Sequence, residues 1–399
     1  MLLSIVCSAS AIVFTMSLKA TVLAFGQQLG FHQVQIGSLL PMPEAADHYQ
    51  QWLDQGYAAD MEYLKRDPAR RSTPNKTFEA AKSVIIVSVS YYSVTPTPPP
   101  GSYGRVARYA VGEDYHRVIR RRLSDFCALL EKEVGRPIAA RPVTDDAALY
   151  EQALAERHGL GFVGKNSLII GPKLSGSYNF IAELFVNLEL EADLEYQGTC
   201  GNCVRCIAAC PTDAIKDSAT TPGAALMVDS NLCISYLTIE NKGGIPLSLR
   251  SKMGDWVYGC DICQEVCPYN SKPIPAPWPE FAPHNGAGHH LNLPQLLQIE
   301  SDEKFVKRFQ KSPLRRPKRR GLLRNALVVM GNQLKEEHSC RAEIVTAIGQ
   351  FAAAESDQML LEHSVWALAQ CPKPATKIIV ADIIARLSPE VLLQVENYV

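Results

Sequence analysis

The sequence predicts an α+β protein with an α/β-type core, followed by a small cysteine-rich unit and a C-terminal helical unit. Three observations lead to this expectation. Apolar runs alternate with amphipathic helical patterns over residues 17–195, eight of the 12 cysteines fall within 196–275, and helical periodicity dominates 276–399. A chain of 399 residues is long enough for two to three domains of about 150 residues each.

The composition is that of an ordinary globular protein. Lys and Arg total 40 against 41 Asp and Glu, so the net charge is −1, and 47% of the residues are hydrophobic. These values exclude collagen-like and disordered chains. Twelve cysteines in a chain of this length are also too few for a disulfide scaffold.

The first 16 residues are apolar but resemble neither a membrane span nor a secretory signal. The run is shorter than the ~20 residues that cross a bilayer, and the first basic residue is Lys19. We favour a start site placed too early, with Met16 as the true start, over a short buried segment or a targeting segment. We therefore expect residues 1–16 to be a non-native or disordered extension, and we expect no membrane association elsewhere.

Three helical patterns are expected in the first unit. One begins near Ser17, and residues 114–134 form an amphipathic pattern of helix length. Another covers 149–158 and is closed by Gly159, the residue type that most often ends a helix.

Three strands are expected between these helices. The β-branched and aromatic run 83–92 is typical of a buried strand, and 167–171 and 178–188 show similar patterns. The proline-rich stretch 96–100 is expected to be a surface loop. Strands that alternate with helices favour an α/β or α+β core.

Proline content predicts an extended linker over 273–283, ahead of the C-terminal helices. The helices themselves are expected in pairs that resemble HEAT-like repeat units. They cover 321–334, 340–354, 357–370 and 374–386.

The cysteines are the strongest signal in the sequence. CGNCVRCIAACP over 200–211 has the spacing C-x2-C-x2-C-x3-C-P, CDICQEVCP over 260–268 is a second run, and Cys233 lies between them. In such runs the first three thiolates bind one cubane, and the cysteine before proline ligates the other. The spacing therefore predicts two [4Fe–4S] clusters, the first held by Cys200, Cys203, Cys206 and Cys267, and the second held by Cys210, Cys233, Cys260 and Cys263.

A pair of zinc knuckles is the alternative interpretation of these runs, although zinc leaves the third cysteine and the Cys-Pro pairs unexplained. We expect the remaining cysteines, Cys7, Cys127, Cys340 and Cys371, to be small buried hydrophobic residues. Clusters of this kind need reduced thiolates, which predicts a cytoplasmic protein.

Two adjacent cubanes transfer single electrons, which fits either an electron carrier or a reductive enzyme. A carrier needs little besides its clusters, whereas about 195 residues precede this cysteine-rich unit and about 130 follow it. Chain length therefore favours an enzyme.

Several segments around the cysteines resemble the epoxyqueuosine reductase family. They are GYAADMEYL over 56–64, VTDDAALYEQALAERHGLGFVGKNSLII over 143–170, SGSYNFIAEL over 175–184 and CISYLTIENKG over 233–243. The resemblance covers most of the chain beyond Met16. It implies a cobalamin-dependent iron–sulfur enzyme that reduces the epoxide of epoxyqueuosine in the anticodon wobble position of tRNA to give queuosine.

By this resemblance the proton donor to the departing epoxide oxygen is Asp145. Asp146 follows directly, so an assignment shifted by one residue is the alternative, and either aspartate could simply cap the following helix. An acid that keeps its proton near neutral pH needs a raised pKa, and burial against the corrin would raise it.

The same resemblance implies the cobalamin contacts, with the cofactor at rest as cob(II)alamin. They are Arg71, Ala107, Arg108, Asp145, Ser167, Ile169, Ile181 and Ser235. For Arg71 a solvated surface side chain is the alternative, and for Ile169 and Ile181 a core position. No DxHxxG motif is present, so we expect no histidine ligand to cobalt and interpret His116 and His158 as structural.

Residues 304–324 contain ten Lys or Arg and no acid, which leaves −1 − 10 = −11 on the rest of the chain. Such a stretch suits phosphate-backbone binding, so we expect tRNA with a queuosine-type anticodon as the partner. The candidate contacts are Arg315, Arg316, Lys318, Arg319 and Arg320.

The alternatives are a cobalamin-dependent reductase of a small molecule, similar to a dehalogenase, and a non-catalytic iron–sulfur carrier. As an enzyme, the protein would need a low-potential electron donor, which the sequence does not identify. We expect it to be a monomer.

Overall fold

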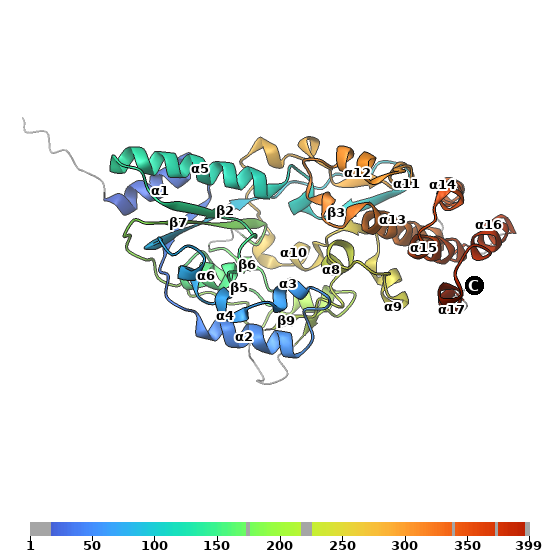
Figure 1. The fold of residues 1–399 in the computed structure, drawn as a ribbon, viewed down its shortest axis with the longest axis horizontal. Helices are drawn as coiled ribbons and strands as arrows, with labels where there is room; N and C mark the ends of the chain where they lie inside the picture. The colour runs from blue at the N-terminus through green and yellow to red at the C-terminus, as the bar shows by residue number, and fades with distance from the viewer. Residues whose placement is uncertain (1–16, 173–175, 217–225, 337–339, 372–373, 396–399) are drawn as a thin grey trace, which may run out of the picture.

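The computed structural model describes residues 17–172, 176–216, 226–336, 340–371 and 374–395. The expected N-terminal extension, residues 1–16, lies outside these ranges. Within them the molecule is elongated, with a sheet-containing half at one end and the C-terminal helices at the other (Figure 1). No helix in the described ranges combines the length and the apolar character that a membrane span requires.

A four-stranded sheet forms the first half, in the order β1 (Gln33–Gly37), β2 (Ser83–Ser90), β7 (Asn179–Val186) and β4 (Ala140–Val143). All three pairings are antiparallel. The pairing corresponds to the α+β arrangement, and the parallel α/β-type core that the alternation also allowed is not formed. The expected strands over 83–92 and 178–188 are β2 and β7.

Helices cover both faces of this sheet (Figure 1). On one face lie α1 (Leu18–Gln28), which is capped by the Ser17 hydroxyl, and α5 (Tyr115–Val134). On the other face lie α2 (Pro43–Asp54) and α6 (Glu151–Arg157). The buried side chains of α5 recur every three or four residues and form one face: Val118, Ile119, Leu123, Phe126 and Leu130.

The elements on the α6 side of the sheet carry the residues of the functional site. Helix α6 ends at Gly159, whose φ of 84° is in the left-handed region that glycine adopts without strain. The N–H groups of Gly159 and Leu160 then satisfy the last carbonyls of the helix. The chain continues into a short hairpin of β5 (Phe162–Val163) and β6 (Ile169–Ile170), which returns it to the sheet. The remaining helices on this side are α3 (Glu62–Lys65) and α4 (Pro68–Arg71).

The cysteine-rich segment consists of short elements. They are α7 (Arg205–Ala209), β8 (Ile215–Lys216), β9 (Met227–Val228), α8 (Ile234–Ile239), α9 (Leu247–Arg250) and α10 (Ile262–Glu265). A second sheet joins this segment to the rest, with β10 (Trp256–Tyr258) parallel and β11 (His290–Asn292) antiparallel to β3 (Tyr103–Val106). Each of the three expected units therefore contributes one strand to this sheet.

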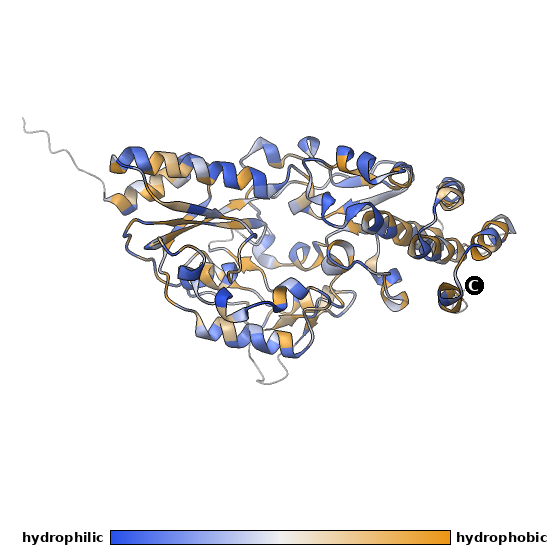
Figure 2. Cartoon of the chain, in the orientation of Figure 1, coloured by the Kyte–Doolittle hydropathy of each residue, from blue (hydrophilic) through white to orange (hydrophobic). Residues whose placement is uncertain are grey.

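The C-terminal half is helical, as expected. The four expected helices are α13 (Lys318–Lys335), α14 (Arg341–Ala354), α15 (Gln358–Ala369) and α16 (Pro374–Ile384). Around them lie α11 (Leu293–Leu297), α12 (Asp302–Arg308) and α17 (Pro389–Val395). Helices α13 and α15 are packed together and rich in hydrophobic residues (Figure 2). Their core is continuous with the sheet that contains β10.

The proline-rich segment 273–283 is not a free linker. Trp278 and Phe281 are buried in the core between α1 and α5, and the Trp278 indole N–H donates to the Leu29 carbonyl at 3.0 Å. The segment packs on the core because burial of each of these two aromatic side chains removes a large apolar area from water, and this outweighs the extended linker that its prolines favour.

Helix α13 is tied to α8 by a buried cation. Arg324 is fully buried and donates to the carbonyls of Leu237 at 2.6 Å and Asn241 at 2.8 Å, while burial lowers its pKa to about 9. The same arginine also donates to Gly243. Because α8 begins directly after Cys233, this network helps to position one of the cysteines.

We predict that Arg324→Met lowers the free energy of unfolding by about 3 kcal/mol or more, since each buried carbonyl left without a donor costs about 1–3 kcal/mol. Urea unfolding followed by circular dichroism measures the change. Arg315→Met, at an exposed position, is the matched control and should change stability by less than about 0.5 kcal/mol. Equal stability of the two variants would contradict the role of Arg324.

Candidate functional site

Asp145 lies in the loop that joins β4 to α6, residues 144–150, which we call the acid loop. Its φ of 54° is unusual for a residue other than glycine, and two hydrogen bonds hold the turn. The Asp145 N–H donates to Glu151 Oε1 at 2.9 Å, and the Thr144 N–H donates to Asp146 Oδ1 at 3.0 Å. The N-cap residue of α6 is Tyr150, so the expectation that an aspartate caps this helix is wrong.

The two aspartates have different surroundings. The Asp146 carboxylate is engaged by the Thr144 N–H and by Arg120. The Asp145 carboxylate accepts only the Tyr115 hydroxyl, at 2.7 Å, among the hydrogen bonds found in the described chain, and its side chain is 70% exposed. Asp145 is therefore the aspartate that is free to face a substrate.

Tyr115 and His116, in the first turn of α5, form the other side of this site. The Tyr115 ring stacks on Phe180 at 4.3 Å and on His116 at 4.0 Å, and burial raises the pKa of its hydroxyl, which stays a donor to Asp145. His116 Nε2 lies 3.9 Å from Asp145 Oδ2. Its Nδ1 atom lies 2.8 Å from Oδ1 of Asp114, the N-cap of α5, so His116 stands between the helix cap and Asp145. His158 is buried and bonded to Ser38 and Asp193, as a structural histidine would be.

Behind the acid loop lie two carboxyl groups that sequence reasoning missed. Burial, with the nearby Asp145 charge, raises the pKa of Glu151 to about 8. Glu183, in the middle of β7, is fully buried, and burial followed by the Glu151 charge raises its pKa well above the usual range. An ionisable residue inside the apolar run NFIAELFV was the available signal, because a charge in a buried strand is rare.

The expected cofactor contacts fall into separate groups. Arg71 lies beside the acid loop, where its carbonyl accepts the Tyr150 N–H at 3.1 Å and its guanidinium donates to the Tyr63 carbonyl at 3.2 Å. The Arg71 Nε atom is buried and has no partner in the part of the chain that the structure describes. A buried donor of this kind can bind an amide or phosphate oxygen of a cofactor side chain.

A second group lines the sheet face under α6. Ile169 is only 7% exposed and belongs to the core there, as its alternative interpretation stated, whereas Ile181 is half-buried against the same core. Ser167 has a φ of 60° in the loop before Ile169. Ser235 lies elsewhere, in the first turn of α8, two residues after Cys233.

Arg108 joins the first unit to the cysteine-rich segment. Its guanidinium pairs with Asp261 at 3.1 Å and with Glu265 at 2.9 Å, and its backbone N–H donates to Asp261 at 2.8 Å. Neighbouring Ala107 is buried, with its Cβ against Gly259. These contacts hold the cysteine-rich segment against the residues that precede α5.

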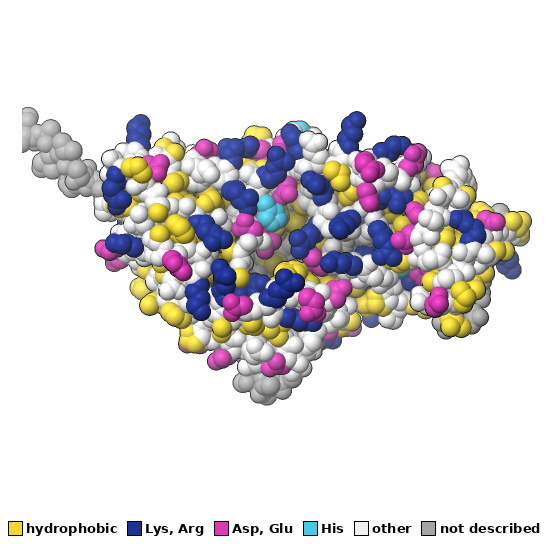
Figure 3. All heavy atoms as spheres, viewed as in Figure 1, with side chains coloured by type: hydrophobic (Ala, Val, Ile, Leu, Met, Phe, Trp, Pro, Cys, Tyr) yellow, Lys and Arg dark blue, Asp and Glu magenta, His cyan; other side chains and the backbone are white. Residues whose placement is uncertain are grey.

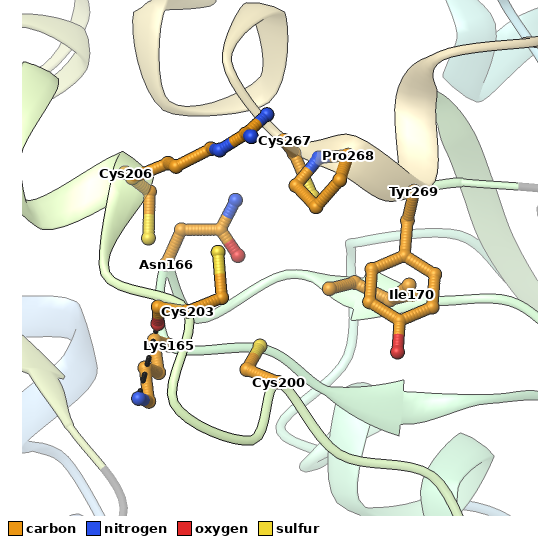
Figure 4. Close-up of a pocket in the computed structure, with 10 residues that line it drawn as sticks. Lys165, Asn166, Ile170, Cys200, Cys203, Cys206, Cys267, Pro268 and Tyr269 are labelled. Atoms are coloured by element: carbon orange, nitrogen blue, oxygen red, sulfur yellow. Dashed lines mark hydrogen bonds between the residues drawn. The ribbon is translucent and has the colours of Figure 1, made fainter.

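One pocket is lined by Cys200, Cys203, Cys206 and Cys267, which come from two segments that are distant in the sequence (Figure 4). The Lys165 ammonium donates to the carbonyls of Gly201 and Cys203, and Tyr269 OH donates to Thr199 O. The structure thus brings together the four thiols that the crossed spacing assigns to one cluster.

Asn166 lines the same pocket and was also missed at the sequence level (Figure 4). Both polar atoms of its amide are buried, and the amide lies close enough to the Cys263 thiol to lower its pKa. An amide N–H facing thiols is the kind of donor that iron–sulfur clusters accept. Asn166 therefore fits a cluster in this pocket.

The other four cysteines, Cys210, Cys233, Cys260 and Cys263, are part-buried as well. Burial raises the pKa of Cys233 and Cys260, and that of Cys263 to about 12, with further contributions from the neighbouring thiols. The Ala214 N–H donates to Cys210 Sγ at 3.3 Å. Main-chain N–H groups of residues 235, 236 and 262 face the Cys233 and Cys260 thiols. Buried thiolates need positive charge nearby, which bound iron supplies, so this donor set fits a second cluster.

Fewer cations of the basic stretch 304–324 are available to a binding partner than its sequence suggests. Arg316 pairs with Glu240 at 2.7 Å, Arg319 with Glu355 at 3.0 Å and Arg320 with Asp357 at 2.5 Å. Arg315 and Lys318 are exposed and make no ion pair within the described ranges. The acids come from other segments, so a count along the chain could not find them.

Lys and Arg side chains nevertheless gather around a hollow on one face of the molecule (Figure 3). The hollow lies between α5 and α3 in the view of Figure 1, and apolar side chains are visible inside it. A basic rim around an apolar hollow suits a polyanion that inserts one flat, apolar group.

Two protein families match parts of this chain. The family described as "4Fe-4S double cluster binding domain" matches residues 199–270, which include all eight clustered cysteines. The family described as "Epoxyqueuosine reductase QueG, DUF1730" matches residues 71–146, which begin at Arg71 and end just after Asp145. The chain therefore contains a double [4Fe–4S] cluster domain, and the zinc-knuckle alternative is set aside.

Curated relatives cover most of the chain. It is 38% identical over 318 residues to the epoxyqueuosine reductase of Pseudomonas aeruginosa, covering 77% of this chain and 83% of that one. It is 36% identical over 353 residues to that of Escherichia coli K12, covering 87% of both chains.

Solved structures agree with this similarity. An epoxyqueuosine reductase crystallised with an epoxyqueuosine-modified tRNA stem loop superposes with a TM-score of 0.83 and 26% identity, over 95% of this chain and 97% of that one. A Bacillus subtilis epoxyqueuosine reductase, whose aspartate-bearing catalytic loop is swung out of the active site, superposes with a TM-score of 0.79 at 26% identity, over 95% and 97% of the two chains. With this fold and relatives above 30% identity over most of its length, the chain belongs to the epoxyqueuosine reductase family.

Proposed function

We propose that this protein reduces the epoxide of epoxyqueuosine in tRNA to give queuosine, with electrons passed through two [4Fe–4S] clusters to cobalamin. One observation carries the proposal. Arg108 binds Asp261 and Glu265 and so holds the cluster domain against the residues that precede α5, whose first turn carries Tyr115, the hydrogen-bond partner of Asp145. The tRNA stem loop bound by a relative of the same fold supports the substrate.

The candidate site residues fit the proposed chemistry. Cobalamin, when bound, supplies a low-valent cobalt that acts as a nucleophile or as a one-electron donor. Arg71, Ser167, Ile181 and Ser235 are the candidate contacts for its corrin and side chains, with Ala107, Arg108 and Ile169 behind them. Asp145 protonates the departing oxygen, and the Tyr115 hydroxyl orients its carboxyl group from 2.7 Å.

Asp145 is exposed in this structure, so the substrate and the cofactor must supply the burial that a proton donor needs. The aspartate-bearing catalytic loop of the Bacillus subtilis relative is swung out, and we infer that the acid loop of this chain moves in the same way. The few hydrogen bonds that hold Asp145 are consistent with such a movement.

Further features belong to this proposal. We infer that the enzyme rests with cob(II)alamin, works as a monomer in the cytoplasm and receives electrons from a low-potential donor. We also propose a division into 17–195, 196–275 and 276–399, with HEAT-like helices α13–α16 in the last unit. The exposed cations around the hollow favour tRNA over a small-molecule substrate.

We predict that Asp145→Asn lowers turnover by about 100-fold or more, because a positioned proton donor contributes about 10²–10⁴ to a rate. Nucleoside analysis of tRNA after anaerobic incubation measures product, and iron and cobalamin contents should stay unchanged. Asp146→Asn is the matched control, since its amide oxygen still accepts the Thr144 N–H. Its turnover should stay within about fivefold, because an exposed ion pair contributes at most about 1 kcal/mol. A larger loss from Asp146→Asn than from Asp145→Asn would move the acid to Asp146.

The cysteine pocket leads to a second prediction. Cys267→Ser should lower the iron content from about eight to about four per chain, because one cubane loses a ligand while the other keeps all four. Cys127→Ser, on α5 and away from the clusters, should retain about eight. Iron analysis and electron paramagnetic resonance of the reduced protein distinguish these results. Loss of all iron from Cys267→Ser would contradict separate ligand sets.

The ion pairs limit which of the candidate cations are available to bind tRNA. Neutralising all five candidate cations should weaken binding, but Arg315 and Lys318 are the two without acid partners in the described chain. The double variant Arg315→Gln with Lys318→Gln should reduce the slope of log affinity against log salt by about two, one for each lost phosphate contact.

The control for this experiment is Lys132→Gln with Arg136→Gln, at the far end of α5. This helix of 20 residues places the control about 30 Å from Tyr115. The control should leave the salt slope unchanged, with both variants measured by filter binding. An unaltered slope in the first variant would remove the basic stretch from the tRNA interface.

A further inference from the structure

The buried carboxyl group of Glu183 has no role in the reaction as described so far. Its side chain is fully buried, and neither carboxyl oxygen finds a hydrogen-bond partner among the described residues. Its neighbours across the sheet are Ile86 on β2 and Val143 on β4, which are both apolar. The charged groups that act on Glu183 are Glu151, Asp145 and Asp146, all of them acids. An ionised carboxylate in these surroundings would be strongly destabilised, so Glu183 holds a proton.

Glu183 lies directly behind the acid loop. It is paired with Val143, the last residue of β4, and Asp145 follows only two residues later. Glu151, the first residue of α6, lies beside the same loop, and its Oε1 atom accepts the Asp145 N–H at 2.9 Å. Burial, followed by the charges of Asp145 and Asp146, raises the pKa of Glu151 to about 8 although Arg71 acts in the opposite direction, so Glu151 is also largely protonated at neutral pH.

The proposed reaction consumes more protons than Asp145 carries. Removing an epoxide oxygen as water breaks two C–O bonds, forms one C=C bond and two O–H bonds, and takes up two electrons and two protons. The clusters and cobalamin supply the electrons, and Asp145 supplies one proton. A second proton must therefore reach the oxygen before it leaves as water.

We propose that Glu183 and Glu151 hold this second proton and pass it to Asp145 after Asp145 has protonated the substrate oxygen, an inference that rests on the proposed function. Glu151 donates to Asp145 through one water or through a rotation of the Asp145 side chain, and Glu183 then reprotonates Glu151. The second proton reaches the hydroxyl group as its C–O bond breaks, and because the departing hydroxide is a stronger base than any carboxylate, the overall transfer is downhill. Both glutamates act through Asp145 and are positioning residues rather than catalytic ones.

An internal proton store matters because the substrate closes the site. Asp145 is 70% exposed in the free protein and could take a proton from water. A nucleoside inserted into the hollow would cover this carboxyl group and exclude solvent from it. The carboxyl groups of Glu183 and Glu151 are themselves buried, and they lie next to the two ends of the acid loop, so a proton held on them does not depend on access of solvent to Asp145.

The test compares Glu183→Gln and Glu151→Gln with Glu156→Gln in the cofactor-loaded enzyme. Glutamine keeps the shape of each side chain, and at residue 151 it still accepts the Asp145 N–H, but it stores no proton. Glu156, also on α6, accepts the Val163 N–H and is the matched control. Single-turnover rates on tRNA carrying epoxyqueuosine should fall about tenfold for the first two variants and stay unchanged for the third.

The pH profile separates proton storage from a merely structural role. The wild-type rate should decline above about pH 8, where Glu151 loses its proton, and approach the rate of the variants. The rate of Glu183→Gln and Glu151→Gln should be low and flat through the same range. A parallel decline in all proteins, or unchanged rates in both variants, would overturn the proposal.

A measurement without cofactors or substrate tests the stored proton itself. Infrared spectra of the apoprotein at pH 7 should contain carbonyl bands of protonated, buried carboxylic acids; Glu183→Gln should remove the Glu183 contribution and leave that of Glu151, whereas Glu156→Gln should keep both. Stability gives the same information, because a folded state that binds an extra proton loses stability as pH rises from about 5 to 8. Glu183→Gln should lose less stability over this range than the wild type.

The outcomes distinguish failure of the proton store from failure of the proposed function. An apoprotein without the infrared contribution of Glu183 and with an unchanged stability slope in Glu183→Gln would overturn the proton store, whatever the activity. A wild-type enzyme that leaves epoxyqueuosine tRNA unaltered would instead contradict the proposed function, while the infrared result would still report on Glu183.

Discussion

Thiols from segments distant in the sequence must meet in the double-cluster domain, and the rest of this structure depends on that requirement. Cys267 completes the pocket of three cysteines that lie more than 50 residues earlier in the sequence. The segments that carry them are short and have little regular structure, so contacts from outside hold them in place. Lys165 binds the first run, Arg108 binds α10, and Arg324 binds α8 from the C-terminal helices. Each major part of the chain thus contributes a side chain that holds the cluster domain.

The site between the clusters and the sheet combines two kinds of buried acid. The thiols need iron to exist there as thiolates, because burial otherwise favours their neutral form. For the carboxyl groups of Glu151 and Glu183 burial outweighs any nearby positive charge, so both pKa values are raised and the protonated forms are favoured. In the proposed reaction the thiols would hold the clusters that carry electrons, and the carboxyl groups would store a proton.

Charge is arranged differently at the surface. The stretch 304–324 has ten cations and no acid in its own sequence, yet Glu240, Glu355 and Asp357 neutralise three of its arginines. These pairs fix the position of α13 against neighbouring segments rather than leaving all charges for a partner. Attraction for a phosphate backbone then depends on the unpaired cations and on the basic rim of the hollow (Figure 3).

Local pattern was enough to predict much of this protein. The spacing of the cysteines predicted their two groups, since ligation by C-x2-C-x2-C-x3-C-P is a property of a short segment, and the structure brings the first four thiols to one pocket. Periodicity located α5, α6 and the C-terminal helices, and the resemblance proposed Asp145 as the acid. Only the tertiary structure decided the antiparallel order of the sheet, the burial of Trp278, the partners of the arginines and the isolation of Glu183 from any cation. These properties depend on residues that are distant in the sequence, and burial and Coulomb interactions are set by distances in space.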